Sequence, residues 1–185
     1  MKATELLEAQ HREVEKLFKQ IEKAEDDEKG ELFEELAANV VAHDAIEREI
    51  FYPACEKEMG MTELLGEALV EHGVVEFCLF EADQALENDT FLFKVKVLKE
   101  MIEHHVEEEE KELFPKVEKA LGKQLLEEIG VKMEARFEKV KESDFRKPLL
   151  DNLRQVLAGT IKPVKNGSKK GSAKKPAGKS KSASA

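Results

Sequence analysis

Apolar residues recur every three or four positions along most of the chain, which is the spacing of one face of an α-helix. Four such segments predict helices over residues 4–25, 31–57, 62–87 and 90–119. Short polar stretches separate them, and Thr4, Thr62 and Thr90 stand where N-caps are expected. Because short connections force neighbouring helices to run antiparallel, the pattern predicts an all-α fold, with an antiparallel up-down four-helix bundle over residues 1–120.

Residues 121–161 continue the helical pattern beyond Gly122. The apolar positions form two groups separated around Ser143, namely Leu125, Ile129, Met133, Phe137 and Val140, then Leu149, Leu150, Leu153, Val156 and Leu157. This predicts one or two extra C-terminal helices. They contain neither histidine nor cysteine, so we expect accessory helices packed on the bundle of a monomer, with the contact surface of a homodimer as the alternative.

The last segment, residues 162–185, changes to lysine, serine, alanine, glycine and proline, and this composition predicts a disordered tail. It carries eight lysines, so the net charge of −10 for the whole chain leaves −18 on residues 1–161. A lysine-rich tail can contact the phosphates of nucleic acid nonspecifically, although no aromatic residue is present to stack on bases. Weak folding back onto the acidic bundle is the alternative.

A related segment occurs on the second and fourth predicted helices, HDAIEREIFYP at residues 43–53 and HVEEEEKELFP at residues 105–115. In both, glutamate follows histidine by four positions, so the two side chains lie on one helix face. His43, Glu47, His105 and Glu109 occupy positions where the apolar stripe calls for core residues, whereas His104 is rotated by roughly 100 degrees. We therefore expect these four side chains to point into the bundle.

His11 and His72 lie in the same way on the apolar stripes of the first and third helices. Four helices would thus direct imidazoles, and two of them carboxylates, to one level of the bundle. One interpretation is a set of core histidines satisfied by the carboxylates. However, no lysine or arginine lies on these stripes, so buried carboxylates would be uncompensated at several kcal/mol each. Bound cations remove that cost, and a metal site is the favoured interpretation.

The order His11, then His43 with Glu47, then His72, then His105 with Glu109 resembles the ligand pattern of the hemerythrin-like (HHE) cation-binding family. The resemblance covers Met1 to about Ala120 and includes FYP at residues 51–53 and LFP at residues 113–115. It implies a non-haem di-iron centre, two iron ions bridged by oxo or hydroxo, with manganese or zinc less favoured. It also implies that Glu47 and Glu109 bridge the ions, with His11 and His43 on one and His72 and His105 on the other.

Glu76 departs from the pattern of the oxygen-carrying hemerythrins, which have a second histidine four residues after the one on the third helix. A carboxylate ligand here would favour ferric over ferrous iron and leave a position open to water or peroxide. Glu76 is either such a ligand or a solvated residue at the edge of the apolar stripe. In both cases reversible oxygen carriage is disfavoured, and sensing, scavenging or iron handling is favoured.

Other functions remain as alternatives. A ferritin-like di-iron bundle needs Glu-x-x-His on two helices, and no glutamate lies three positions before His43, His72, His104 or His105. The favoured function is binding of oxygen, peroxide or nitric oxide at iron without turnover. Peroxide disproportionation and iron donation for the repair of iron centres are the enzymatic alternatives. The alternative of another class is a metal-free helical interaction protein that its lysine tail tethers to nucleic acid.

The remaining signals concern location and two side-chain types. No apolar run is long enough to span a bilayer and the N-terminus lacks the core of a signal peptide, so we expect a cytoplasmic protein without membrane contact. Cys55 and Cys78 form no C-x-x-C pair and are interpreted as free thiols. Tyr52 lies one turn after Glu47, and a packing role is favoured over a hydrogen bond to the site.

Overall fold

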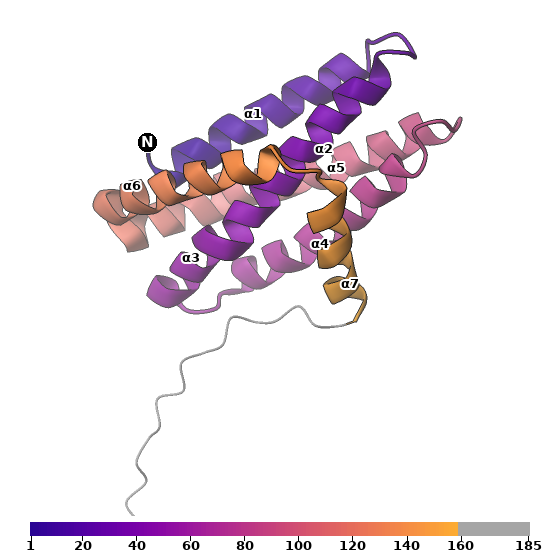
Figure 1. Ribbon diagram of the computed structural model, residues 1–185. Coiled ribbons are helices and arrows are strands. Elements are labelled where there is room, and N and C mark those ends of the chain that lie inside the picture. Colours follow the sequence, from indigo (N-terminus) through magenta and orange to yellow (C-terminus); the bar gives the residue numbers. More distant parts are fainter. Residues whose placement is uncertain (159–185) are drawn as a thin grey trace, which may run out of the picture.

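The computed structural model describes residues 1–158, and all regular structure within them is helical. The elements in chain order are α1 (Ala3–Ile21), α2 (Lys29–Ile46), η1 (Glu47–Phe51), α3 (Tyr52–Met59), α4 (Glu63–Asp83), α5 (Phe91–Glu108), η2 (Glu109–Leu113), α6 (Phe114–Lys141) and α7 (Arg146–Leu157). Figure 1 shows α1 beside α2 and α4 beside α5 as two antiparallel pairs, which form the bundle. The predicted all-α bundle with extra C-terminal helices is confirmed.

Two of the predicted helices contain a π-helical turn, and each turn begins at a predicted ligand. In η1 the backbone N–H of Tyr52 donates to the carbonyl of Glu47, and in η2 the N–H of Phe114 donates to that of Glu109. Pro53 and Pro115 follow directly. A proline inside an α-helix clashes with the carbonyl four residues earlier, and the wider π turn relieves that clash. The helices therefore continue past both prolines instead of breaking there.

The helix starts agree only partly with the predicted N-caps. The hydroxyl of Thr62 accepts the N–H of Leu65 at 3.3 Å, which confirms Thr62 as the cap of α4. The Thr4 prediction is wrong, because α1 begins one residue earlier with Lys2 as its N-cap. The Thr4 side chain instead donates a hydrogen bond to Glu118 at 2.7 Å, tying α1 to α6.

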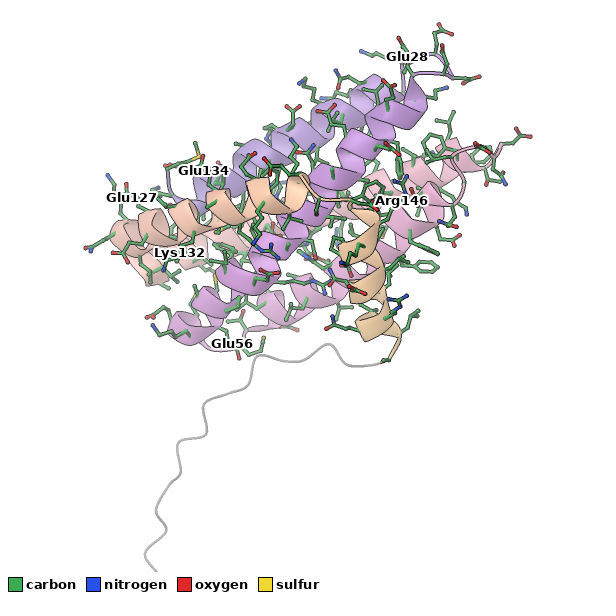
Figure 2. All side chains as sticks on the ribbon, viewed as in Figure 1. Glu28, Glu56, Glu127, Lys132, Glu134 and Arg146 are labelled. Atoms are coloured by element: carbon green, nitrogen blue, oxygen red, sulfur yellow. The ribbon has the colours of Figure 1, made fainter. Side chains whose placement is uncertain are left out.

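The chain reverses at Gly122, whose φ of 71° interrupts α6. The second part of α6 then packs against the bundle through buried residues, and α7 packs on α4. Figure 2 shows Arg146 at the start of α7, with the charged side chains of Glu127, Lys132 and Glu134 along the outside of α6. The domain boundaries at residues 120 and 161 stay predictions, and the basic tail over residues 162–185 lies outside the described residues. Among residues 1–158, no helix is both long and apolar enough to cross a membrane.

Gly130 marks the closest approach of α6 to the start of α1. A β-carbon at Gly130 would lie 2.6 Å from the backbone oxygen of Met1, whereas one at Gly66 on α4 would meet nothing within 4 Å. Gly130→Ala is therefore expected to destabilise the protein by about 1–3 kcal/mol through overpacking. Gly66→Ala, the matched control in another helix, is expected to stabilise it by roughly 0.5–1 kcal/mol. Urea denaturation of both variants measures this, and equal effects would contradict the close contact.

Candidate metal centre

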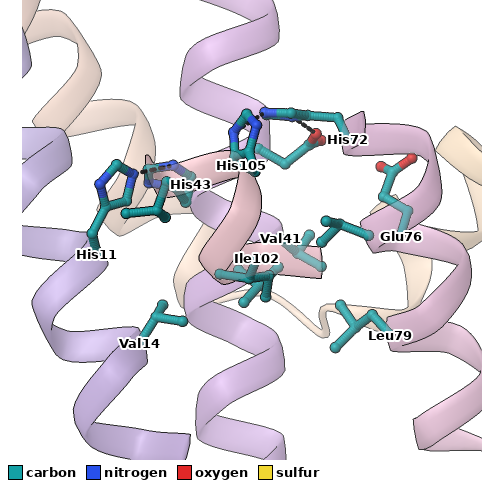
Figure 3. A pocket seen from close by; sticks show the side chains of 13 residues that line it. His11, Val14, Val41, His43, His72, Glu76, Leu79, Ile102 and His105 are labelled. Carbon is teal, nitrogen blue, oxygen red and sulfur yellow. Dashed lines mark hydrogen bonds and ion pairs between the residues drawn. The ribbon is translucent and has the colours of Figure 1, made fainter. Parts of the chain in front are cut away.

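The six predicted ligands come together in the interior of the bundle. His11 Nε2 lies 3.3 Å from His43 Nε2 and 3.5 Å from Glu109 Oε2, and these three atoms form one cluster. Figure 3 shows the paired rings of His11 and His43 on one side and of His72 and His105 on the other. The side chains of the six residues are buried, except that the His43 side chain remains 12% exposed.

The second cluster consists of His72, His105 and Glu47. The Nε2 atoms of His72 and His105 lie 3.1 Å apart, and Glu47 Oε2 lies 3.2 Å from His72 Nε2. Glu47 Oε2 also lies 3.0 Å from His43 Nε2, and Glu109 Oε2 lies 3.6 Å from His105 Nε2. Each carboxylate thus contacts histidines of both clusters, so the geometry can hold two cations that share the two carboxylates.

The opposite nitrogen of every ring is held by an oxygen. His11 Nδ1 donates to Glu110 Oε1, His43 Nδ1 to Gln10 Oε1 and His105 Nδ1 to Glu71 Oε2, each at 2.8 Å. His72 Nδ1 donates to Asp44 Oδ1. Because Nδ1 carries the hydrogen, the lone pair of the neutral ring is on Nε2. Such partners orient metal-binding histidines and increase their basicity, so all four rings present Nε2 as a ligand atom to the interior.

Three of the four oxygens of the two interior carboxylates, Glu47 and Glu109, lack an aligned donor among the described residues. Within the described residues, no aligned hydrogen bond reaches either oxygen of Glu47 or Oε2 of Glu109, although these atoms are buried. Exposed fractions of 0% for Glu47 and 2% for Glu109 exclude compensation by bulk water. A buried carboxylate without compensation costs several kcal/mol. The residues present therefore fit a divalent or trivalent cation pair, since imidazole nitrogen and carboxylate oxygen together suit iron, manganese or zinc.

Without metal, His11 and His72 bind protons more tightly than ordinary histidines do. Burial lowers the pKa of His11, but the adjacent carboxylates of Glu109 and Glu110 outweigh it and raise the pKa to about 9. Burial likewise disfavours the charged form of His72, and the hydrogen bond to Asp44 raises its pKa to about 10. Burial opposes ionisation of Glu47, yet the charges of His43 and His72 hold its pKa well below the ordinary value. A metal ion binding here must therefore displace protons from the imidazoles.

Glu76 lies in an outer polar layer rather than among the converging ligand atoms. It is 3% exposed, so the solvated interpretation is wrong. Asn152 Nδ2 donates to one of its oxygens at 2.6 Å and Arg48 Nη2 to the other at 3.0 Å. Burial and the nearby charge of Asp44 raise the Glu76 pKa to about 7. Its role as a ligand stays a prediction, and this position does not support it.

Arg48 changes the charge balance expected from the sequence. The apolar stripes carry no basic residue, yet Arg48 reaches inward beside them and donates to Asp44 Oδ1 at 2.7 Å. It compensates Asp44 and Glu76, which belong to the outer layer. Among the described residues, Arg48 forms no hydrogen bond with Glu47 or Glu109, so it does not compensate the interior carboxylates.

Tyr52 takes part in the centre, so the prediction that favours a packing role over a hydrogen bond to the site is wrong. Its hydroxyl donates to Glu109 Oε1 at 2.9 Å and lies 2.9 Å from His72 Nε2. Burial and the charge of Glu109 raise the pKa of the phenol well above its ordinary value, which keeps it a neutral donor. Cys55 is buried, Cys78 is half-buried, and both are free thiols, as expected.

The Tyr52→Phe variant should show how much this donor matters. Removing the hydroxyl leaves Glu109 Oε1 without its hydrogen bond, which is expected to destabilise the metal-free protein by about 1–3 kcal/mol. Because Tyr52 is not among the converging ligand atoms, the variant should still bind as much metal as the unaltered protein. Urea denaturation after chelation and metal analysis after reconstitution check the two results. Unchanged stability would contradict the hydrogen bond.

A small cavity adjoins the four histidines. It has a volume of about 40 Å³, and Figure 3 shows the apolar side chains of Val14, Val41, Leu79 and Ile102 beside the rings. A larger groove of about 330 Å³ lies between α1 and α5, beside Arg12, Glu103 and Glu107. The groove and the cavity share four lining residues, His11, Val14, Ile102 and Val106. The cavity beside the histidines and the groove on the surface are therefore neighbours.

Comparison with known proteins supports a cation-binding role for this centre. The family model described as Hemerythrin HHE cation binding domain matches residues 2–117. The chain belongs to this family. A solved structure, a hemerythrin HHE cation binding domain-containing protein from Mycobacterium kansasii, is 27% identical with a TM-score of 0.70, covering 83% of this chain and 99% of the other. Among curated proteins, none matches. The matched residues include α1 to η2 and therefore all six predicted ligands of this hemerythrin HHE domain.

Sequence reasoning missed the outer partners of the histidines in this HHE domain. These partners are Gln10, Asp44, Glu71 and Glu110, with Arg48 and Asn152 beyond them. A weak signal exists, because all four partners lie next to a predicted ligand in sequence: Gln10 precedes His11, Asp44 follows His43, Glu71 precedes His72 and Glu110 follows Glu109. Each partner, however, serves a histidine on a different helix, so sequence adjacency alone would have paired them wrongly.

Proposed function

We propose that this protein is a non-haem di-iron protein that binds oxygen, peroxide or nitric oxide. His11 and His43 would hold one iron ion, His72 and His105 the other, and Glu47 and Glu109 would be shared by both. The observation that carries the proposal is a pair of buried carboxylates, three of whose four oxygens lack an aligned donor among the described residues, surrounded by four Nε2 atoms. Once bound, iron supplies the redox-active centre at which such small ligands react.

The size and lining of the cavity support small, weakly polar ligands. A water molecule needs roughly 10–15 Å³ of such volume. A cavity of about 40 Å³ beside the four histidines therefore has space for a diatomic molecule or peroxide, and not for a larger substrate. Its apolar wall of valine, leucine and isoleucine offers few hydrogen bonds. Sensing, scavenging or iron handling follows from such a site, and turnover of organic substrates does not.

The decisive experiment measures metal per chain in aerobically purified protein, together with its absorption spectrum before and after reduction and re-exposure to air. The proposal expects iron, in about two ions per chain, with absorption that bleaches on reduction and returns in air. The rate of return separates ligand binding from simple oxidation. Manganese or zinc in place of iron would correct the metal. No metal, and none taken up from ferrous iron without oxygen, would overturn the proposal.

A further inference from the structure

Helix α7 lies outside the matched family domain, which ends at residue 117, yet it reaches the polar layer around the metal centre. Asn152 on α7 donates through the same Nδ2 to Asp44 Oδ2 at 3.2 Å and to Glu76 Oε1 at 2.6 Å. Asp44 in turn accepts the Nδ1 hydrogen of His72. One side chain of α7 is thus separated from a predicted ligand by a single carboxylate.

The contacts of α7 are concentrated on the part of the bundle that presents His72. Val156 lies 3.4 Å from the place of a β-carbon at Gly73, the residue after His72, so α7 packs directly against the backbone there. At the other end, Arg146 forms an ion pair with Asp83 at 2.8 Å. Leu149 and Leu153 are buried between these contacts. The docked position of α7 is therefore set by α4, from Gly73 next to His72 to Asp83 at its end.

Within residues 1–158, the hydrogen bonds that hold the two histidines of the other cluster involve Gln10 and Glu110 and no residue of α7. His43 donates to the neutral amide of Gln10, and His11 donates to Glu110, which pairs with the exposed Arg12. The polar layer around His72 instead holds Asp44 and Glu76, two buried carboxylates, for which Arg48 and Asn152 supply the donors. If α7 leaves, both carboxylates lose a donor, and only Arg48 and His72 still hold the orientation of Asp44. The two clusters differ in this respect although their ligands are alike.

We propose that α7 is a latch for one of the two metal positions, with Asn152 as a positioning residue that holds Asp44 and thereby His72. The position formed by His72, His105 and Glu47 keeps its ion only while α7 is docked, and the position formed by His11, His43 and Glu109 does not depend on it. Undocking of α7 would then release or expose one ion selectively. This inference rests on the proposed di-iron function.

The test measures the release of iron from the reconstituted full-length protein into an excess of ferrous chelator. Asn152→Asp keeps the shape of the side chain but removes its donor and adds a charge beside two carboxylates. This variant is expected to release one of the two ions about 10-fold faster and the other at the unaltered rate. Losing an outer partner of a ligand lowers metal affinity by roughly 10- to 100-fold, and the expected change corresponds to the lower end of that range. Asn152→Gln keeps the donor and should restore much of the slow release. Arg154→Ala, at a position whose side chain is 74% exposed, is the control and should change nothing.

Leu153→Ala weakens the docking of α7 without touching the polar layer and is expected to give the same selective release. It also provides the test if the aspartate variant does not fold. A general loss of stability would speed the release of both ions, so release of both ions at equal rates in Asn152→Asp and Leu153→Ala would overturn the latch. Unaltered protein that takes up no iron would overturn the proposed function as well, which separates the two failures.

Discussion

Replacing His105 with alanine is expected to lower the iron content by at least half, whereas the same change at the adjacent His104 should leave it unaltered. His105 directs Nε2 to within 3.1 Å of that of His72, while the side chain of His104 is 61% exposed and contacts Glu71 and Glu108 at the surface. Losing an outer partner of a ligand already costs roughly 10- to 100-fold in affinity, and losing the ligand itself should cost more. Metal analysis of both variants after identical reconstitution measures the difference.

The same pair of variants should separate metal binding from folding. A ligand that binds only the folded state stabilises it by about 4 kcal/mol at a free concentration of 1,000 times its Kd. We expect iron to raise the denaturation midpoint of the unaltered protein and of His104→Ala, and to raise that of His105→Ala far less. If the two variants keep equal iron and equal iron-dependent stabilisation, His105 is not a ligand and the assignment of the second cluster is wrong.

The metal-free protein is expected to lose stability as the pH rises from about 6.5 toward 10. The pKa values of His11 and His72 are raised to about 9 and about 10 in the folded state, from an ordinary value of 6.5. Groups with raised pKa values add stability that is fully present below pH 6.5 and disappears as the pH passes the folded values. A tenfold change in proton affinity between the unfolded and folded states corresponds to about 1.4 kcal/mol, so the two histidines together account for several kcal/mol.

Urea denaturation of chelator-treated protein at pH 6, 8 and 10 gives this profile. His72→Gln removes one of the two titrations and should flatten it, while His104→Gln at the surface should not. The iron-loaded protein should behave differently between pH 6 and 8, because protons compete with the metal for Nε2 and affinity rises as they leave. A metal-free protein whose stability is constant from pH 6 to 10 would contradict the buried ion pairs around His11 and His72.

Periodicity alone located the interior His and Glu side chains. A residue on the apolar face of an amphipathic helix must point to the core whatever the partner helix is, so His43 and Glu47 could be placed before any contact was known. The same argument separated His105 from His104, since one residue turns a helix by about 100 degrees. It failed for Arg48 and Asp44, which are polar residues at the border of the stripe, where burial depends on how closely the next helix approaches.

Spacing along single helices was enough to predict the helical bundle, the six converging side chains and the family. The packing between helices determined the contacts that depend on how neighbouring helices are aligned. These contacts are the oxygen that holds each Nδ1, the hydrogen bond from Tyr52 to Glu109, and the hydrogen bond from Asn152 to Asp44 across 108 residues of chain. It also set the π turns at Glu47 and Glu109, where a proline must be accommodated without breaking a packed helix. Contacts between distant elements depend on the packing of the whole core, so they cannot be predicted from the spacing of residues along a single helix.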